Sequence, residues 1–343
     1  MRGIGVLLLA VAAAWPGQQA FGWGATGHEW ATGIAIEKLP DEVPAFVRDP
    51  TMLPELALMG RELDRSKGAG ETHDKERDPG HYIDIADDGK VMGILPVEQV
   101  PVTREAYDTK LRDGGSTQYQ AGYLPYSIID GWQQIRKDFA YWRAAVKGAE
   151  TATTPEERAW FEADRRLREK LTLRDIGVWS HYVADASQPL HVSVHYNGWG
   201  KFPNPAGYTD KKMHAFFEGE FVKRNIKREA VAALVPPFKP EPLPDTNNLT
   251  VLVQDKTQSL LRLSLAQVVP LYELEKQGGF KAGDQRGIEF ATARLATGAQ
   301  FIRDMIADAW AASATGMVGY PMVNVRDIES GKVRATRELM GAD

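Results

Sequence analysis

The segment His181-Tyr-Val-Ala-Asp185-Ala-Ser-Gln-Pro-Leu-His191 carries the clearest pattern in the chain. His181 and Asp185 are four residues apart, so on a helix both side chains point to the same side. Gln188-Pro189 ends that helix, and His191 follows just after the break. Imidazole nitrogens and carboxylate oxygens are ligands that zinc accepts. The segment therefore predicts a central helix that carries metal ligands.

Helical signals also dominate the rest of the chain, with apolar residues recurring at helical spacing. The expected helices are residues 26–39, 53–63, 126–146, 155–171, 172–187, 212–226, 249–277 and 284–312. Gly, Pro and polar residues predict long loops at 65–90 and 192–210, and a surface connection at 235–244. No alternating strand pattern of any length is present. The expected fold is all-α, a single compact multi-helix domain with long loops.

The first 22 residues have the pattern of a secretory signal peptide. Arg2 gives a positive start, and the apolar stretch from Gly5 to Trp15 is too short to span a bilayer. Small residues at Ala20 and Gly22 predict cleavage after Gly22, with an uncleaved anchor as the alternative. The mature protein would then be secreted or periplasmic and begin at Trp23. Residues 23–315 would form the helical domain, and 316–343 a tail to which the sequence assigns no role.

Composition narrows the possible functions. The 343 residues include no cysteine and carry a net charge of −5, which becomes −6 when Arg2 leaves with the signal peptide. Stability must therefore come from the core and any bound metal, and a metal site must use nitrogen and oxygen ligands. The net negative charge does not favour non-specific binding of duplex nucleic acid. No obligate protein partner is evident.

Further candidate ligands lie on both sides of the opening segment. A free α-amino group at Trp23, together with its own carbonyl, would chelate a metal through a five-membered ring. His214 and Glu218 repeat the four-residue spacing 23 residues after His191. In chain order the candidate metal ligands are Trp23, His28, Asp64, His81, His181, Asp185, His191, His214 and Glu218.

This ordered set resembles the ligands of the trinuclear zinc phosphodiesterase superfamily. That group contains the single-strand-specific nucleases of the nuclease P-one type and the bacterial phospholipases C that hydrolyse phosphatidylcholine. Its mature chains begin with Trp, place a His five residues later, and end the ligand series with His-x3-Asp or His-x3-Glu. The resemblance covers about residues 23–226. It implies the all-α fold of this group and three Zn²⁺ ions.

The resemblance also implies how the ligands divide. Asp185 would bridge two ions, one bound further by Asp64, His81 and His181, and the other by Trp23 and His28. The third ion would bind His191, His214 and Glu218. Clustered zinc lowers the pKa of a bound water toward ~7, so hydroxide would be available to attack a phosphate ester. No side-chain nucleophile is then needed.

Asp84, three residues after His81, is the candidate catalytic residue, because both branches of the superfamily have an Asp here. Its alternative role is to cap a loop. Tyr82 would either stack on a base or anchor the loop. After the position of His191 the nucleases have Asp-x-Gly-Gly-Asn. Gly198, Gly200 and Asn204 match this pattern only in part. The candidate substrate-binding residues are Tyr82, Asn197, Trp199 and Asn204, with Trp199 and Phe202 as stacking groups, contacts to an apolar substrate, or loop packing.

Two branches of the superfamily compete for the substrate. The spacing from His191 to His214 resembles the nucleases, whereas Glu218 resembles the phospholipases. We expect an endonuclease that hydrolyses single-stranded DNA or RNA, with 3′-nucleotidase activity. The alternatives are a phospholipase C acting on phosphatidylcholine at a membrane surface, and a zinc-holding binding protein without catalysis.

The remaining candidates are expected at the surface. His73 and His195 match no ligand position. We expect His73 to be exposed in a flexible loop and His195 to be exposed at the surface, with a position at the mouth of the site as the alternative for His195. A run of basic residues near the last ligands is expected to be a solvated helix face, with attraction of phosphates as the alternative. This run consists of Lys211, Lys212, Lys223, Arg224, Lys227 and Arg228.

Overall fold

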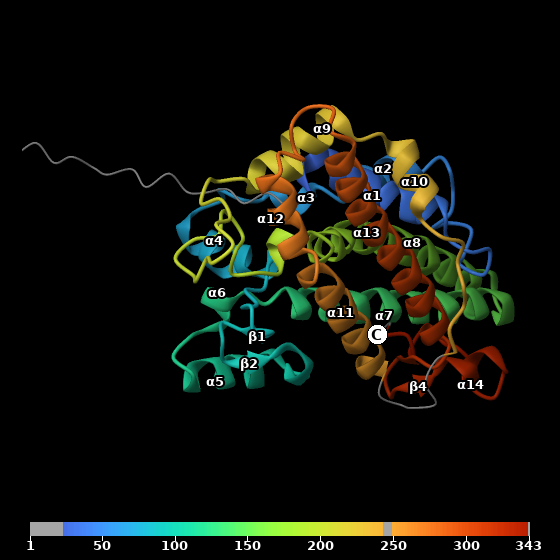
Figure 1. Cartoon of the computed structure of the whole chain (residues 1–343). Helices are drawn as coiled ribbons and strands as arrows, with labels where there is room; N and C mark the ends of the chain where they lie inside the picture. The colour runs from blue at the N-terminus through green and yellow to red at the C-terminus, as the bar shows by residue number, and fades with distance from the viewer. Residues whose placement is uncertain (1–22, 243–248, 342–343) are drawn as a thin grey trace, which may run out of the picture.

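Two long helices, α7 (Leu124–Thr151) and α8 (Pro155–Ala186), lie side by side at the centre of the molecule (Figure 1). Helix α13 (Gln285–Ser313) packs against both of them, and α1 (Gly24–Glu37) packs against α8 and α13. This computed structural model describes residues 23–242 and 249–341, so the predicted signal peptide and the end of the 235–244 connection lie outside the described residues. The protein is mostly helical, with 62% helix and 3% strand in one compact domain, which confirms the predicted fold class.

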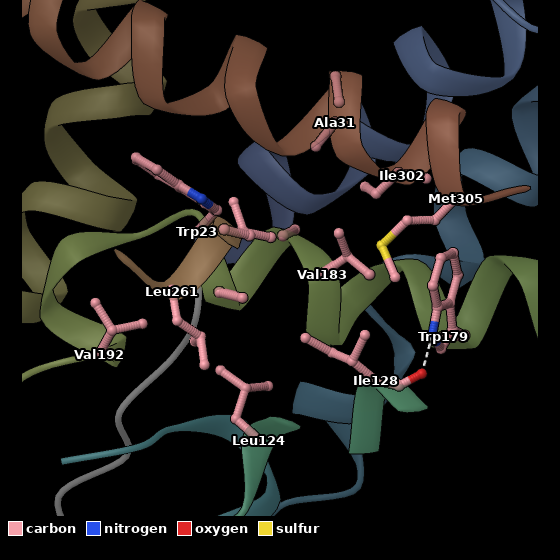
Figure 2. Packing of buried hydrophobic residues seen from close by; sticks show 14 of the residues in the cluster. Trp23, Ala31, Leu124, Ile128, Trp179, Val183, Val192, Leu261, Ile302 and Met305 are labelled. Atoms are coloured by element: carbon pink, nitrogen blue, oxygen red, sulfur yellow. Dashed lines mark hydrogen bonds between the residues drawn. The ribbon is translucent and has the colours of Figure 1, made fainter. Parts of the chain in front are cut away.

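The α7 helix forms around a stripe of apolar side chains. Ile128, Trp132, Ile135 and Phe139 recur at helical spacing and are fully or almost fully buried. The indole of Trp132 donates to the carbonyl oxygen of Met305 on α13 (2.8 Å). The indole of Trp179 on α8 donates to the carbonyl oxygen of Ile128 (2.9 Å), drawn as a dashed line in Figure 2. Each buried indole N–H therefore has a partner, and these bonds fix how the central helices pack.

The α8 helix is continuous, so the predicted division into 155–171 and 172–187 is wrong. Thr154 caps its start, because Oγ1 accepts from the backbone N–H of Glu157 (3.1 Å). No helix breaker lies at the predicted boundary, where the Thr172 hydroxyl donates to the carbonyl oxygen of Arg168 (2.7 Å). The composition changes because the charged first half lies at the surface and the second half enters the core.

The predicted helix 249–277 is divided into α11 (Leu249–Leu265) and α12 (Val268–Lys276). Pro270 explains the division: it lacks a backbone N–H and its ring would clash with the preceding turn of one continuous helix. Pro270 is tolerated in the first turn of α12, because backbone N–H groups there have no hydrogen-bond partner within the helix. The predicted helix 284–312 is confirmed by α13.

The predicted loop 65–90 is partly wrong, because it contains α4 (Glu71–Arg77) and the 3₁₀ turn η1 (Asp78–His81). Lys75 and Glu71 form an ion pair of 2.5 Å across one turn of α4, a contact that supports a short charged helix. The predicted loop 192–210 has no helix. The other short elements are α2 (Leu53–Met59), α3 (Glu62–Arg65), β1 (Lys90–Val91), β2 (Leu95–Pro96), η2 (Val97–Gln99), α5 (Arg104–Asp113), α6 (Gln118–Ala121), η3 (Pro189–His191), the π-helix η4 (Phe216–Phe221), α9 (Val222–Asn225) and α10 (Arg228–Leu234).

The C-terminal segment from 316 onward folds against α7 (Figure 1). It consists of the antiparallel pair β3 (Met317–Val318) and β4 (Val323–Asn324), followed by α14 (Val325–Glu329). Val318, Val325 and Ile328 are buried in a second apolar cluster with Phe161 of α8. Across residues 23–242 and 249–341, no helix is long and apolar enough to cross a membrane.

Candidate metal centre

Eight of the predicted ligand side chains meet at the buried end of α8. Three groups bring a ring nitrogen or carboxylate oxygen from each member within 4.8 Å of one another. The first is His28, His181 and Asp185, the second is Asp64, His81 and His181, and the third is His191, His214 and Glu218. All eight residues are at most 8% exposed. The groups are therefore buried polar clusters, which the fold must satisfy with hydrogen bonds or ions.

Asp185 faces two different sets of histidines. Its Oδ2 lies 3.0 Å from Nδ1 of His81 and 3.2 Å from Nε2 of His181. Its Oδ1 lies 3.3 Å from Nε2 of His28. One carboxylate thus offers one oxygen to each of two groups, which is the arrangement that the resemblance implies for a bridging ligand.

Three of the imidazoles are oriented by backbone carbonyls behind them. Nδ1 of His181 lies 2.8 Å from the carbonyl oxygen of Gly60, and Nδ1 of His191 lies 2.7 Å from that of His81. Nδ1 of His214 lies 2.8 Å from the carbonyl oxygen of Tyr196. A proton on Nδ1 leaves Nε2 as the lone-pair nitrogen, and in each ring Nε2 points into its group. Donation of the outer N–H to a fixed acceptor is typical of metal-binding histidines.

Several inner atoms of the groups have no hydrogen-bond partner among the described residues. They are both ring nitrogens of His28, Oδ2 of Asp64, Oδ1 of Asp185 and Oε1 of Glu218. In addition, Nε2 of His191 lies 3.1 Å from Nε2 of His214, while Nδ1 of each ring faces a backbone carbonyl oxygen. Cations would satisfy all of these atoms at once. The donor set therefore fits metal ions.

The third group is built on an irregular helix. Glu218 lies in the π-helix η4, and its Oε2 is 2.7 Å from Nε2 of His214 and 3.6 Å from Nε2 of His191. The side-chain amide of Gln188 donates to the same oxygen (3.2 Å). The predicted helix 212–226 is thus a π-helix followed by α9, and single π turns are frequent at functional sites.

The charge states of the groups differ. Burial lowers the pKa of His28, and lowers that of His81 to about 4, so these rings are neutral at pH 7 and can act as ligands. Burial also opposes charge on His191, but Asp185 and Glu218 outweigh it and raise the His191 pKa to about 9. Burial opposes ionisation of Asp185 as well, yet the surrounding histidines hold its pKa well below the usual range.

Trp23 lies at the start of α1 and is fully buried beside the end of α8. Its indole donates to Oγ of Ser187 (2.9 Å), two residues beyond Asp185. Gly24 follows with φ +58°, and a Cβ at this position would lie 3.2 Å from the carbonyl oxygen of Glu218. The left-handed backbone and the close approach both favour glycine here. Trp23 is therefore held near the segments that carry Asp185 and Glu218.

Asp84 lies next to the site in the segment after η1. Its carboxylate makes no hydrogen bond to any residue that the structure describes. Burial raises the pKa of Asp84 to about 8, although the charge of His191 acts in the opposite direction. The carboxyl group therefore exchanges a proton near neutral pH.

The predicted substrate-binding residues take different positions. Tyr82 is half-buried beside His81, and its hydroxyl donates to the carbonyl oxygen of Tyr119 (3.2 Å). Oδ1 of Asn197 accepts from the backbone N–H of His214 (3.2 Å), so this side chain supports a ligand. Trp199 is only 4% exposed. The Asn204 side chain donates to the carbonyl oxygen of Tyr208 and accepts from its backbone N–H, both within the loop. Contact with substrate stays a prediction for all four.

The prediction of a surface position for His195 is wrong. The ring is fully buried and stacks on Trp199, with centroids 3.7 Å apart. Its Nδ1 lies 2.8 Å from the carbonyl oxygen of Trp199, and Nε2 lies 2.9 Å from Oδ1 of Asp87. The hydroxyl of Tyr272 on α12 donates to the His195 carbonyl oxygen (2.6 Å), so packing against a distant helix buries this loop. His73 is partly exposed, but it lies on α4 rather than in a loop.

Sequence reasoning missed Lys67. Its Nζ lies 2.6 Å from Oδ1 of Asp64, and both side chains are 7% exposed. The buried ammonium group therefore places a positive charge beside a candidate ligand. Lys67 lies in the predicted loop 65–90, three residues after Asp64, so no helical pattern in the sequence identifies it.

Comparison of the chain with protein-family models found no match, and comparison with curated proteins found none either. The family resemblance therefore rests on the ligand order and on the geometry of the three groups. The molecule is a mostly helical protein with three buried His/Asp/Glu groups that could bind metals.

Proposed function

We propose that the protein is a secreted or periplasmic hydrolase of phosphoric ester bonds that holds three Zn²⁺ ions and cleaves single-stranded nucleic acid. The observation that carries this proposal is the sharing of Asp185 between two buried histidine groups, with a third group alongside. Bound zinc supplies Lewis acidity that activates water and neutralises charge on phosphoryl oxygens.

Each ion would have its own set of residues. Asp64, His81 and His181 would hold one ion, and His28 with Trp23 another, with Asp185 shared between them. His191, His214 and Glu218 would hold the third. The backbone carbonyls behind His181, His191 and His214 aim the Nε2 atoms of these rings inward. A bound cation would displace the proton that Asp185 and Glu218 favour on His191, because a ligating imidazole must be neutral.

Asp84 is the group best suited to move a proton. An unbonded carboxyl with a pKa of about 8 is matched to accept the proton of an attacking water at neutral pH. Lys67 places a cation beside Asp64, where it would attract the phosphodiester and offset its charge. Neither residue is needed to hold a metal ion, so both can be tested without emptying the site.

The proposal is tested with the zinc-loaded protein that begins at Trp23, offered single-stranded DNA and phosphatidylcholine in parallel. Cleavage of DNA that is lost in His181→Ala supports the proposed nuclease. Release of phosphocholine without DNA cleavage would replace it with a phospholipase C, the activity that Glu218 favours within the resemblance. Bound zinc with hydrolysis of neither substrate would leave a binding protein.

A further inference from the structure

A cleft of about 450 Å³ adjoins the third ligand group. Two segments line it: the chain just before and after His214, and the end of α12 with the turn that follows. We call it the lysine cleft and define it by Lys211, Lys212, Phe216, Lys276 and Lys281. Lys212 is two residues from His214, so the cleft begins beside the candidate metal centre.

The lysine cleft concentrates positive charge in an acidic chain. Its four lysines are all exposed, and the cleft contains one acidic residue, Glu275. None of these four ammonium groups forms an ion pair with a carboxylate of the described chain. Nζ of Lys276 donates to the carbonyl oxygen of Ala206 (2.6 Å), which holds this side chain against the 192–210 loop. The charges are therefore available to an external anion.

A second cleft, of about 600 Å³, has the opposite charge. It adjoins the second ligand group, since it is lined by Pro79 and Tyr82 on either side of His81. Its charged lining residues are Glu71, Asp74, Lys75, Glu76 and Asp78. A chain of phosphates would be repelled there and attracted to the lysine cleft. A bound strand would therefore extend from the metal centre toward the lysine cleft and away from the acidic one.

An aromatic side chain accompanies the lysines. Phe216 lies two residues after His214 and is 40% exposed, whereas Phe280 in the same cleft is 6% exposed. An exposed ring beside several ammonium groups matches the chemistry of an unpaired strand. Lysines neutralise its phosphates, and the ring stacks on a base. A membrane surface would need only the charges.

We propose that the lysine cleft binds the phosphodiester backbone of a single strand beyond the phosphate that is cleaved, with a base stacked on Phe216. This inference rests on the proposed function for the position of the cleaved phosphate. It assigns to the protein a preference for longer substrates, because a dinucleotide would occupy the metal centre without extending into the cleft.

Binding is measured on the chelator-treated protein by fluorescence anisotropy of a labelled oligothymidylate of about 12 nucleotides. The variant Lys211→Glu/Lys212→Glu should weaken binding about tenfold or more, and lower the slope of log affinity against log salt by about 1.4. Lys276→Glu/Lys281→Glu, on the opposite side of the cleft, should give a similar loss. Phe216→Ala should weaken binding without changing the salt slope.

The matched control is Lys223→Glu/Lys227→Glu, which makes the same charge change in the same sequence run but outside the cleft. Equal losses in the control and cleft variants would overturn the proposal. The proposal would also be overturned if the protein bound phosphatidylglycerol vesicles through these lysines and did not bind the oligonucleotide. In the zinc-loaded protein, the cleft variants should cleave a dinucleotide at the wild-type rate. If the wild type cleaves no DNA, the proposed function fails, while the anisotropy still decides whether the cleft binds a strand.

Discussion

The carbonyl oxygen of Gly60 lies 2.8 Å from Nδ1 of His181, so the residue that ends α2 orients a candidate ligand on α8. Next to this contact, the hydroxyls of Thr32 and Ser180 share a hydrogen bond of 2.7 Å between α1 and α8. Three helices that are distant in sequence thus meet behind one imidazole. The orientation of His181 depends on their packing as well as on its own helix.

Replacing Gly60 with Ala should weaken metal binding. The new Cβ would collide with Oγ1 of Thr32 and lie 3.1 Å from the carbonyl oxygen of His28, so α1 or α2 must shift. Loss of an outer hydrogen-bond partner typically lowers metal affinity by about 10–100-fold. Competition with a zinc chelator measures the change. Gly33→Ala is the control, because its Cβ would lie 3.3 Å from Cβ of Ala57 and touch no candidate ligand. Equal affinities in the two variants would contradict the positioning role.

Zinc stoichiometry should separate the bridging ligand from the others. Asp185 faces His28 with one oxygen and His81 with the other, so Asp185→Asn should lose two of the three ions. Glu218 contacts only the third group, so Glu218→Gln should lose one. Elemental analysis of purified protein counts the ions. Asp164→Asn, on the exposed half of α8, should keep the wild-type content. Equal losses at Asp185 and Glu218 would exclude a bridging role.

Asp84→Asn should keep the zinc but lose turnover. The amide has the shape of the carboxyl group and cannot exchange its proton, so kcat should fall by about 10²–10⁴. Zinc content and hydrolysis of single-stranded DNA are measured on the same sample. Asp88→Asn is the control: this exposed carboxylate contacts Lys90 and no ligand. Wild-type turnover in Asp84→Asn would remove the residue from the mechanism.

The ligand order was predictable because it depends on short-range rules. His181 and Asp185 share a face through the helical repeat, and Pro189 ends the helix before His191. The amphipathic stripe of α7 is equally local. What the chain could not reveal was contact between distant segments. The burial of His195 depends on Tyr272, 77 residues away. The His181–Gly60 contact spans 121 residues. Only the packed fold brings such pairs together.

The C-terminal segment shows the same limit. From the sequence, residues after 315 were a tail without a role, because no long periodic pattern is present. In the structure Val318 and Ile328 are buried against Phe161. Isolated apolar residues at irregular spacing carry no secondary-structure signal, and their burial depends on apolar side chains of α7 and α8.

Asp138 should make stability pH-dependent outside the metal centre. Burial raises the pKa of this α7 residue to about 7, with a further rise from Asp175 and opposing contacts from Gln134 and Arg168. Between about pH 4 and 7 the folded protein keeps a proton that the unfolded chain has released. Stability from this group therefore falls as pH rises through that window and stays reduced above it.

Asp138→Asn removes this titration and keeps a hydrogen-bonding amide beside Gln134. The variant should gain about 1–3 kcal/mol over the wild type near pH 8, and clearly less near pH 5. Urea unfolding at both pH values gives the two differences, and any loss of metal at low pH is common to both proteins. Glu150→Gln, at an exposed position on the same helix, controls for charge removal. A pH-independent difference between Asp138→Asn and the wild type would refute the assignment.

The N-terminus gives the sharpest test of the predicted Trp23 ligand. Trp23 is fully buried, and its indole donates to Ser187, two residues beyond Asp185. If its amine is a ligand, one extra residue before Trp23 converts that amine to an amide, which binds zinc poorly because its lone pair is delocalised. A chain with Ala before Trp23 should lose one ion and most of its hydrolytic activity. Trp23→Phe beginning at the same position keeps the amine but loses the bond to Ser187 and part of the ring packing on Phe217, so it should retain all three ions. Full zinc content in the extended chain would show that the site is complete without the amine, with His28, His181 and Asp185 as the ligands of that ion.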